Sequence, residues 1–233
     1  MKKLLGIALA SAAAGLCLSA LKKASDEQTV ELSPVKRSSP NKKAILVVSF
    51  GTSYAQTREK TIGAIEEDFR SAFPEYTIRR AFTSKMIIKK LRERDGIEVD
   101  TVAQALEKLE AEGYSTVICQ PTHVMGGFEF DDVKREVENW KGRFDHIACG
   151  WPLLTSSEDY EQVTEALVQE FSDIPSDAAL VLMGHGTEHP ANATYPALDY
   201  RLKARGCKNF FVGTVEGYPD LQTVMQEVAA IHA

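Results

Sequence analysis

The segment GHGTEHP at 184–190 carries the side chains best suited to chemistry, because His185 lies between two glycines. A histidine with such small neighbours presents an open imidazole, which suits it to binding a metal or accepting a proton. The alternative is a structural histidine that caps the end of a strand. Glu188 and His189 add potential ligands, but their immediate spacing is not that of a closed zinc site.

Two further segments offer acid–base or ligand groups. The segment GTVEGYP at 213–219 places Glu216 between an apolar run and the start of a helix, where it could cap that helix. It could also accept a proton or ligate a cation beside His185. The segment QPTHVMGGFE at 120–129 offers His123 and Glu129, with two glycines that permit close backbone approach to a ligand. Here the alternative is a tight loop with a surface histidine.

The elements that must position these segments alternate between strand and helix. Continuous apolar runs at 44–50 and 178–184 predict strands that are buried on both faces. The predicted strands are 44–50, 76–82, 115–120, 145–149, 178–184 and 210–215, and the predicted helices are 54–73, 84–94, 101–112, 131–140, 157–171, 192–205 and 219–230, the last with Pro219 in its first turn. This alternation predicts an α/β fold with parallel sheets flanked by helices.

The pattern restarts halfway along the chain, which predicts two similar domains. AILVVSFGTSY from Ala44 and AALVLMGHGTE from Ala178 each read as a buried strand and a Gly-Thr pair, followed by a polar stretch and a helix. We expect an N-terminal α/β domain over 44–150 and a C-terminal one over 151–233, with a ligand cleft between them. The candidate side chains all follow strands, and open α/β sheets bind ligands at the carboxyl ends of their strands.

The N-terminal segment reads as an export signal followed by a linker. Two lysines and an unbroken run of apolar and small residues to Leu21 predict a secretory signal peptide over 1–24, cleaved after Ala20 or Ala24. An uncleaved membrane anchor is the alternative, because the run approaches the length of a spanning helix. Residues 25–43 are polar and contain two prolines, which predicts a linker. We therefore expect a periplasmic or otherwise exported protein.

Composition narrows the range of partners. The chain has 233 residues and a formal net charge of −6, with no dense basic stripe, which argues against a nucleic-acid partner. Beyond Cys17, the three cysteines are widely spaced and form no CxxC pair, so they predict neither a disulfide framework nor a cysteine metal site. Small molecules and metal ions are the partners that the candidate side chains favour, and a homo-oligomer is compatible with this composition.

The order of four motifs resembles one known family. FGTSY at 50–54, QPTHVMGG at 120–127, GHGTEHPAN at 184–192 and GTVEGYP at 213–219 resemble the anaerobic sirohydrochlorin cobaltochelatases, which are class II tetrapyrrole chelatases related to ferrochelatase. The resemblance covers residues 44–230. It implies two similar α/β domains that hold a tetrapyrrole between them. It also implies a metal site formed by the histidine of the GHG motif and the glutamate of the VEGYP motif, here His185 and Glu216.

The resemblance also implies a reaction and a substrate-binding surface. Insertion of Co²⁺, or of Fe²⁺, during cobalamin or haem-type biosynthesis removes two N–H protons from the tetrapyrrole. His185 is expected to act as metal ligand and general base, with Glu216 as its partner. Phe128 and Phe130 stand where the family often has an acid and a tyrosine. The side chains expected to support the macrocycle or contact the substrate are Phe50, Thr52, Ser53, Tyr54, His123, Met125 and Glu129.

One departure from the family favours a second hypothesis. Family members continue past the VEGYP helix with a strand, a loop bearing a second metal-binding histidine and a closing helix, whereas this sequence ends at Ala233. We expect either a fragment or a second ligand supplied by His189 or His123. Together with the export signal, this favours as the alternative an exported carrier of haem or metal ions that performs no insertion. A metal-dependent hydrolase using GHGTEH is the third interpretation, although no HExxH or paired-aspartate motif accompanies it.

Overall fold

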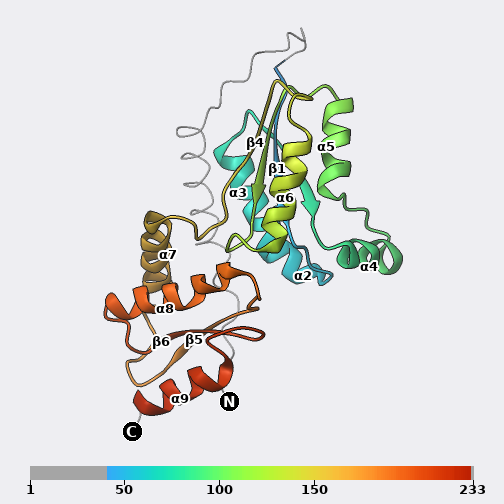
Figure 1. Ribbon diagram of the computed structural model, residues 1–233. Helices are drawn as coiled ribbons and strands as arrows, with labels where there is room; N and C mark the ends of the chain where they lie inside the picture. Colours follow the sequence, from blue (N-terminus) through green and yellow to red (C-terminus); the bar gives the residue numbers. More distant parts are fainter. Residues whose placement is uncertain (1–40, 232–233) are drawn as a thin grey trace. The chain divides into compact units, whose positions relative to one another are not determined.

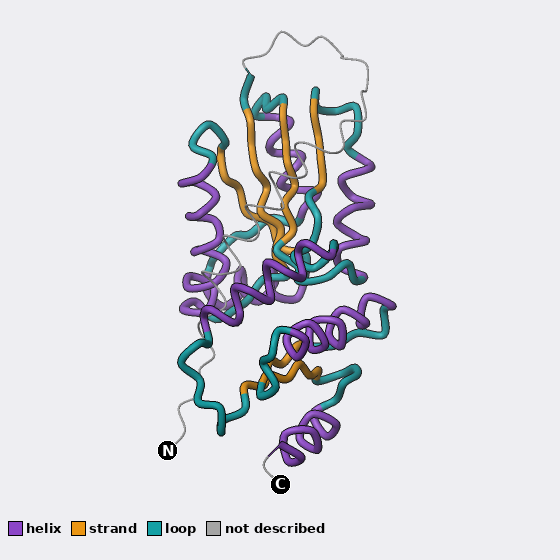
Figure 2. Tube along the Cα trace, turned by 90° about the vertical axis from the view of Figure 1, so that its left-hand side faces the viewer, coloured by secondary structure: helices purple, strands orange, loops and turns teal. Residues whose placement is uncertain are grey.

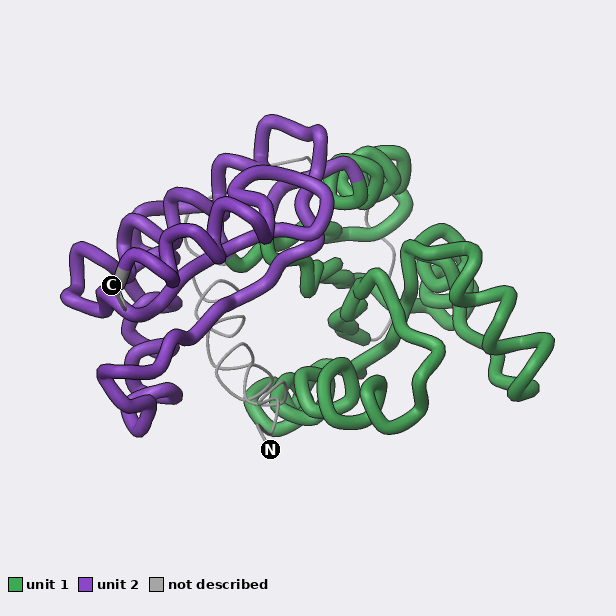
Figure 3. The backbone as a smooth tube through the Cα atoms, turned by 90° about the horizontal axis from the view of Figure 1, so that it is seen from below, with its two compact units in different colours: residues 1–124, 129–153 green, residues 125–128, 154–233 purple. Residues whose placement is uncertain are grey.

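The computed structural model describes residues 41–231. The signal peptide, the anchor alternative and most of the linker fall on residues 1–40, outside the described residues. Two compact units make up the chain: unit 1 runs to Val124 and includes Glu129–Leu153, and unit 2 consists of Met125–Phe128 and the residues from Leu154 onwards (Figure 3). Within residues 41–231, no helix combines the length and the apolar character needed to cross a membrane.

Unit 1 is built on a four-stranded parallel sheet with the order β2-β1-β3-β4 (Figures 1 and 2). Its strands are β1 (Lys43–Ser49), β2 (Thr77–Phe82), β3 (Thr116–Pro121) and β4 (His146–Cys149). Its helical segments are α2 (Ala55–Arg58), the π-helical η1 (Glu59–Gly63), α3 (Ala64–Ala72), α4 (Lys85–Asp95), α5 (Val102–Ala111) and α6 (Phe128–Asn139). Parallel pairing confirms the predicted α/β class.

Two layers of helices bury the apolar side chains of β1. Because side chains alternate along a strand, Leu46 and Val48 pack on one face against residues of α5 and α6. Ile45 and Val47 pack on the other face with Phe69 of α3. Every residue from Ala44 to Ser49 is buried, which confirms a strand covered on both faces; Phe50, the last residue of the predicted strand, lies after it and is exposed. Because helices cover the two faces of the sheet, the loops after the strands form its carboxyl edge.

Unit 2 contains a two-stranded parallel sheet, β5 (Leu180–Gly184) and β6 (Phe210–Thr214). Its helical segments are α7 (Ser157–Glu170), the 3₁₀ segment η2 (Pro190–Ala193), α8 (Thr194–Ala204) and α9 (Leu221–Ile231). β6 is buried throughout, but Met183 of β5 is 43% exposed. The prediction of a fully buried strand over 178–184 is therefore wrong. Both strands have one neighbour among the described strands, but α8 and α9 pack mainly against β6, so β5 receives less cover.

The observed starts of α6 and α9 differ from the predicted starts. α6 begins at Phe128, three residues before the predicted start, so Glu129 lies in its first turn. α9 begins at Leu221, and Pro219 lies before it rather than in its first turn. The Asp220 carboxylate accepts a hydrogen bond from the N–H of Thr223 at 2.7 Å and caps the helix. The same bond lowers the pKa of Asp220 below its ordinary value.

Candidate functional site

Parallel pairing of β5 and β6 brings the GHGT and VEGYP segments together within unit 2. Gly184 and Thr214 are opposite partners at the ends of the two strands. The hydrogen-bond ladder continues beyond them, because the N–H of Val215 donates to the Gly184 carbonyl at 3.0 Å and the N–H of Glu216 donates to the His185 carbonyl at 2.7 Å. Backbone pairing therefore places Glu216 beside His185.

The side chains of this pair face solvent and lie close to each other. Nδ1 of His185 is 3.6 Å from Oε2 of Glu216, and the two side chains are 76% and 69% exposed. The separation is longer than a hydrogen bond but fits two ligands of one cation. With metal–ligand distances of about 2.1 Å, as zinc has to nitrogen and oxygen, the angle at the metal would be about 120°, near tetrahedral. The geometry of the pair is therefore compatible with two ligands of one divalent ion.

Close backbone approach and one bridging side chain hold the two loops together. Gly186 has a φ of +87°, and a Cβ there would lie 2.6 Å from the nitrogen of Gly217, so only glycine fits. Asn192 bridges the loops, because its Oδ1 accepts from the N–H of Thr187 at 3.1 Å and its Nδ2 donates to the carbonyl of Tyr218 at 2.7 Å. This positioning role of Asn192 was not predicted from the sequence. The one indication there was that an asparagine, whose side chain can both donate and accept hydrogen bonds, occurs in the motif GHGTEHPAN.

The histidines expected to supply a further ligand have other environments. Nδ1 of His189 accepts a hydrogen bond from the N–H of Ala191 at 3.0 Å, so this nitrogen offers no lone pair to a metal. Both ring nitrogens of His123 are buried without a hydrogen-bond partner, and burial lowers the pKa of this imidazole. Within residues 41–231, no three His, Cys, Asp or Glu side chains gather to hold a metal ion. The expectation of a second histidine ligand from His189 or His123 gains no support here.

Exposed apolar side chains gather after the strands of unit 1. Among the described residues of this unit, five large hydrophobic side chains are exposed, and each follows a strand by a few residues. We call them the apolar rim: Phe50 and Tyr54 after β1, Met86 after β2, Val124 after β3 and Trp151 after β4. Because the carboxyl ends of parallel strands lie at one edge of a sheet, the rim is a band along that edge, where open α/β sheets bind ligands. Such a band suits a flat, apolar ligand face.

Two arginines hold the FGTSY loop that contributes to this rim. Arg58, 9% exposed, donates from Nη1 to the carbonyl of Thr52 at 3.1 Å. Arg94 donates from Nη2 to the carbonyl of Ser53. Ser53 is only 3% exposed, so its side chain lies beneath the surface, whereas Tyr54 is 69% exposed. Of the side chains expected to support a macrocycle here, the aromatic ones are presented to solvent and Ser53 is not.

The segment QPTHVMGGFE at 120–129 presents fewer side chains to solvent than expected. Glu129 is exposed in the first turn of α6. Met125 is half-buried, and its carbonyl accepts a hydrogen bond from the N–H of Gly127 at 3.0 Å. With both His123 nitrogens buried, Glu129 is the side chain of this segment that offers an accessible polar group.

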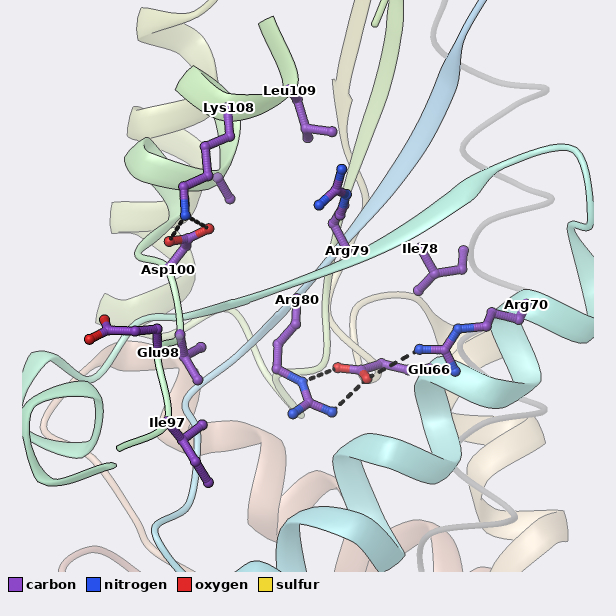
Figure 4. A pocket seen from close by; sticks show the side chains of 12 residues that line it. Glu66, Arg70, Ile78, Arg79, Arg80, Ile97, Glu98, Asp100, Lys108 and Leu109 are labelled. Atoms are coloured by element: carbon purple, nitrogen blue, oxygen red, sulfur yellow. Dashed lines mark hydrogen bonds and ion pairs between the residues drawn. The ribbon is translucent and has the colours of Figure 1, made fainter. Parts of the chain in front are cut away.

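A hollow of about 350 Å³ along β2 is lined by none of these residues (Figure 4). Several of its charged groups form ion pairs across the hollow. Both carboxylate oxygens of Glu66 accept hydrogen bonds from Arg80 at 2.6 Å, and Lys108 donates to Asp100 at 2.7 and 2.9 Å. The Glu66 side chain is only 4% exposed. These ion pairs join β2 to α3 and α5 to the loop before it. They therefore account for the charged lining of the hollow by the packing of the fold.

The parallel α/β fold and the solvent-facing His185–Glu216 pair are compatible with an α/β protein that handles metal ions. The chain matches the cobalt chelatase (CbiK) family over residues 43–232. It belongs to this family of metal chelatases, which confirms the resemblance carried by the four motifs.

Individual relatives agree with this membership. The chain is 44% identical over 187 residues to the sirohydrochlorin cobaltochelatase of Salmonella typhimurium, an alignment that covers 80% of this chain and 70% of that protein. It is 34% identical over 200 residues to sirohydrochlorin cobaltochelatase CbiKC of Nitratidesulfovibrio vulgaris, covering 84% and 70%. SirB from Bacillus subtilis with Fe³⁺ shares the fold, with a TM-score of 0.56 at 15% identity, over 80% of this chain and 71% of that one. The predicted chelatase-like α/β fold is thereby confirmed.

Proposed function

We propose that this chain inserts Co²⁺ into sirohydrochlorin. The observation that carries the proposal is the exposed His185–Glu216 pair, with nitrogen and oxygen 3.6 Å apart. Imidazole and carboxylate together suit a borderline divalent ion such as Co²⁺, and they also suit Fe²⁺, which is the alternative metal. Both relatives named above are sirohydrochlorin cobaltochelatases, which supports a tetrapyrrole as the second substrate.

The proposed reaction exchanges two pyrrole protons for one metal ion. Nδ1 of His185 and Oε2 of Glu216 first hold Co²⁺ as it loses water. When the ion passes to the nitrogens of the macrocycle, the imidazole lone pair and the carboxylate become free again. Each then accepts one of the two displaced protons, so charge and atoms balance. The same two side chains thus serve as metal ligands and then as bases.

The apolar rim of unit 1 is the surface that we assign to the macrocycle. Phe50 and Tyr54 are 48% and 69% exposed and present aromatic faces at the end of β1. Aromatic side chains favour offset-stacked or edge-to-face contacts with other flat π-systems. The nearly buried Arg58 stabilises this loop through its hydrogen bond to the Thr52 carbonyl. A rigid aromatic surface of this kind supports a tetrapyrrole with little loss of side-chain freedom.

A carrier of haem or metal ions that performs no insertion is the second candidate. Within the described residues, ligand groups gather only as a pair rather than as a closed set, which favours reversible binding. The N-terminal apolar run predicts export, and we propose a periplasmic or otherwise exported location for either function.

Absorbance spectroscopy on the purified full-length chain separates the two candidates. With sirohydrochlorin and Co²⁺, an insertion rate that rises linearly with protein concentration supports the chelatase, and Fe²⁺ in parallel gives the metal preference. Insertion no faster than in the protein-free mixture, with a Soret-absorbing pigment that co-purifies with the protein, would establish the carrier. A fusion of residues 1–40 to alkaline phosphatase, which is active only after export, tests the location.

A further inference from the structure

One lysine of unit 1 lies beside the apolar rim without a direct ion pair to a carboxylate. Nζ of Lys90 is 6.0 Å from the centre of the Tyr54 ring. Within residues 41–231, Lys90 forms no ion pair with an aspartate or glutamate. The neighbouring Asp95 attracts Lys90 electrostatically, but its two oxygens already accept hydrogen bonds from Arg94 at 2.7 and 2.6 Å. Lys90 therefore presents at the surface an ammonium group that no carboxylate contacts directly.

The start of α4 fixes this lysine relative to the rim. The N–H of Ser84, the residue that caps α4, donates to the carbonyl of Phe50 at 3.2 Å. Met86, 71% exposed, and Lys90 are four residues apart and hence neighbours on one face of the helix. Lys90 thus has two exposed apolar neighbours: Met86 on its own helix and the Tyr54 ring near its ammonium group.

The helices at the two sides of the rim carry opposite charge. α4 has five cationic and two carboxylate side chains, whereas α6 has two cationic and five carboxylate side chains. Lys134 also lies over a rim residue, 5.6 Å from the ring of Trp151, but most charged residues of its own helix, α6, are acidic. An anionic ligand on the rim is therefore attracted towards α4.

We propose that Lys90 binds a peripheral carboxylate of the tetrapyrrole while Tyr54 and Met86 cover the adjoining edge of the ring. The proposal rests on the proposed function, which supplies a substrate of this chemistry, since sirohydrochlorin is a flat macrocycle bordered by acetate and propionate groups. The cation–π contact with Tyr54 restricts the ammonium group before the ligand arrives. A lysine–carboxylate contact is a charge-assisted hydrogen bond. Lys90 is then a specificity-determining residue that favours macrocycles with free acids.

Titration of metal-free sirohydrochlorin into the full-length protein, followed by tetrapyrrole absorbance, measures Kd without insertion. Lys90→Gln should raise Kd by about two- to fivefold, the range expected for an exposed ion pair, and Lys90→Glu should raise it further. Lys43→Gln is the matched control, because Nζ of Lys43 lies 5.5 Å from the Tyr76 ring but at the amino end of β1. This control should bind like the wild type. The same macrocycle with its carboxylates esterified should bind equally to the wild type and to Lys90→Gln.

The outcomes separate this inference from the proposed function. An unchanged Kd in Lys90→Gln, or a loss that persists with the esterified macrocycle, overturns the role of Lys90. In the insertion assay, Lys90→Gln should raise KM and leave kcat unchanged. A wild type that binds sirohydrochlorin through Lys90 but inserts no Co²⁺ would refute the proposed function alone. A wild type that inserts Co²⁺ with a Kd insensitive to Lys90→Gln would refute this inference alone, and a wild type that binds no tetrapyrrole would refute both.

Discussion

Replacing Gly186 by alanine should separate the two loops that carry His185 and Glu216. The new Cβ would lie 2.6 Å from the nitrogen of Gly217 and 2.9 Å from the carbonyl carbon of Glu216, and backbone atoms cannot rotate away. The φ of +87° adds the strain of a left-handed backbone, about 1–2 kcal/mol. Overlap in a close-packed loop adds about 1–3 kcal/mol. The free energy of unfolding of unit 2 should therefore fall by about 2–5 kcal/mol.

Gly206→Ala is the matched control for this experiment. Gly206 has a φ of +91° but nothing within 4 Å of its added Cβ, so alanine there should bring the backbone strain alone, about 1–2 kcal/mol. Urea unfolding followed by far-UV circular dichroism measures both variants, since Trp140 and Trp151 lie in unit 1 and do not report on unit 2. The Co²⁺ insertion rate should fall by more than about tenfold in Gly186→Ala and stay near the wild-type rate in Gly206→Ala. Equal unfolding free energies and equal rates in the two variants would refute the argument that close approach holds the pair.

Three other features give expected outcomes. Arg80→Met should lower the free energy of unfolding by about 1–3 kcal/mol, because the buried carboxylate of Glu66 loses its bidentate partner and keeps only Arg70, 3.8 Å away, and adding Glu66→Leu should restore most of the loss in chemical denaturation. Burial holds the pKa of His123 below its usual value, so the unfolded chain binds a proton that the folded chain does not, and the free energy of unfolding should fall as the pH drops below about 6.5 towards the folded pKa. His123→Asn should flatten this part of the pH profile, and an unchanged profile would contradict the assignment. Burial raises the pKa of the Cys149 thiol to about 12, so iodoacetamide near pH 8 should alkylate it far more slowly than a free cysteine, and equal rates by mass spectrometry would contradict its burial.

Local sequence patterns predicted most helices and strands, because each pattern is compatible with one kind of secondary structure. The continuous apolar run at 44–50 needed cover on both faces, and β1 has it. The similar run at 178–184 did not predict the exposure of Met183, because exposure depends on which strand the helices pack against, and α8 and α9 pack mainly against β6. The start of α9 was misplaced because Pro219 and Asp220 both suit a helix N-terminus, and only the hydrogen bond to Thr223 distinguishes them.

The candidate site was predictable where backbone pairing determines it. His185 and Glu216 follow strands that pair in parallel, so their proximity follows from the strand order. The Asn192 bridge and the contact between Lys90 and Tyr54 were not predictable in this way. Both contacts depend on how helical segments pack against loops that are distant in the sequence. The spacing of residues along the chain does not predict that packing.

The most direct test of metal handling by His185 is the initial rate of Co²⁺ insertion into sirohydrochlorin by His185→Ala, measured beside His146→Ala. His146 is an exposed histidine at the start of β4, at the amino edge of the sheet of unit 1, and serves as the matched control. We expect His185→Ala to lose about a hundredfold or more of the wild-type rate, with His146→Ala unchanged. Equal insertion rates in His185→Ala and the wild type would contradict the assignment of His185 as metal ligand and base.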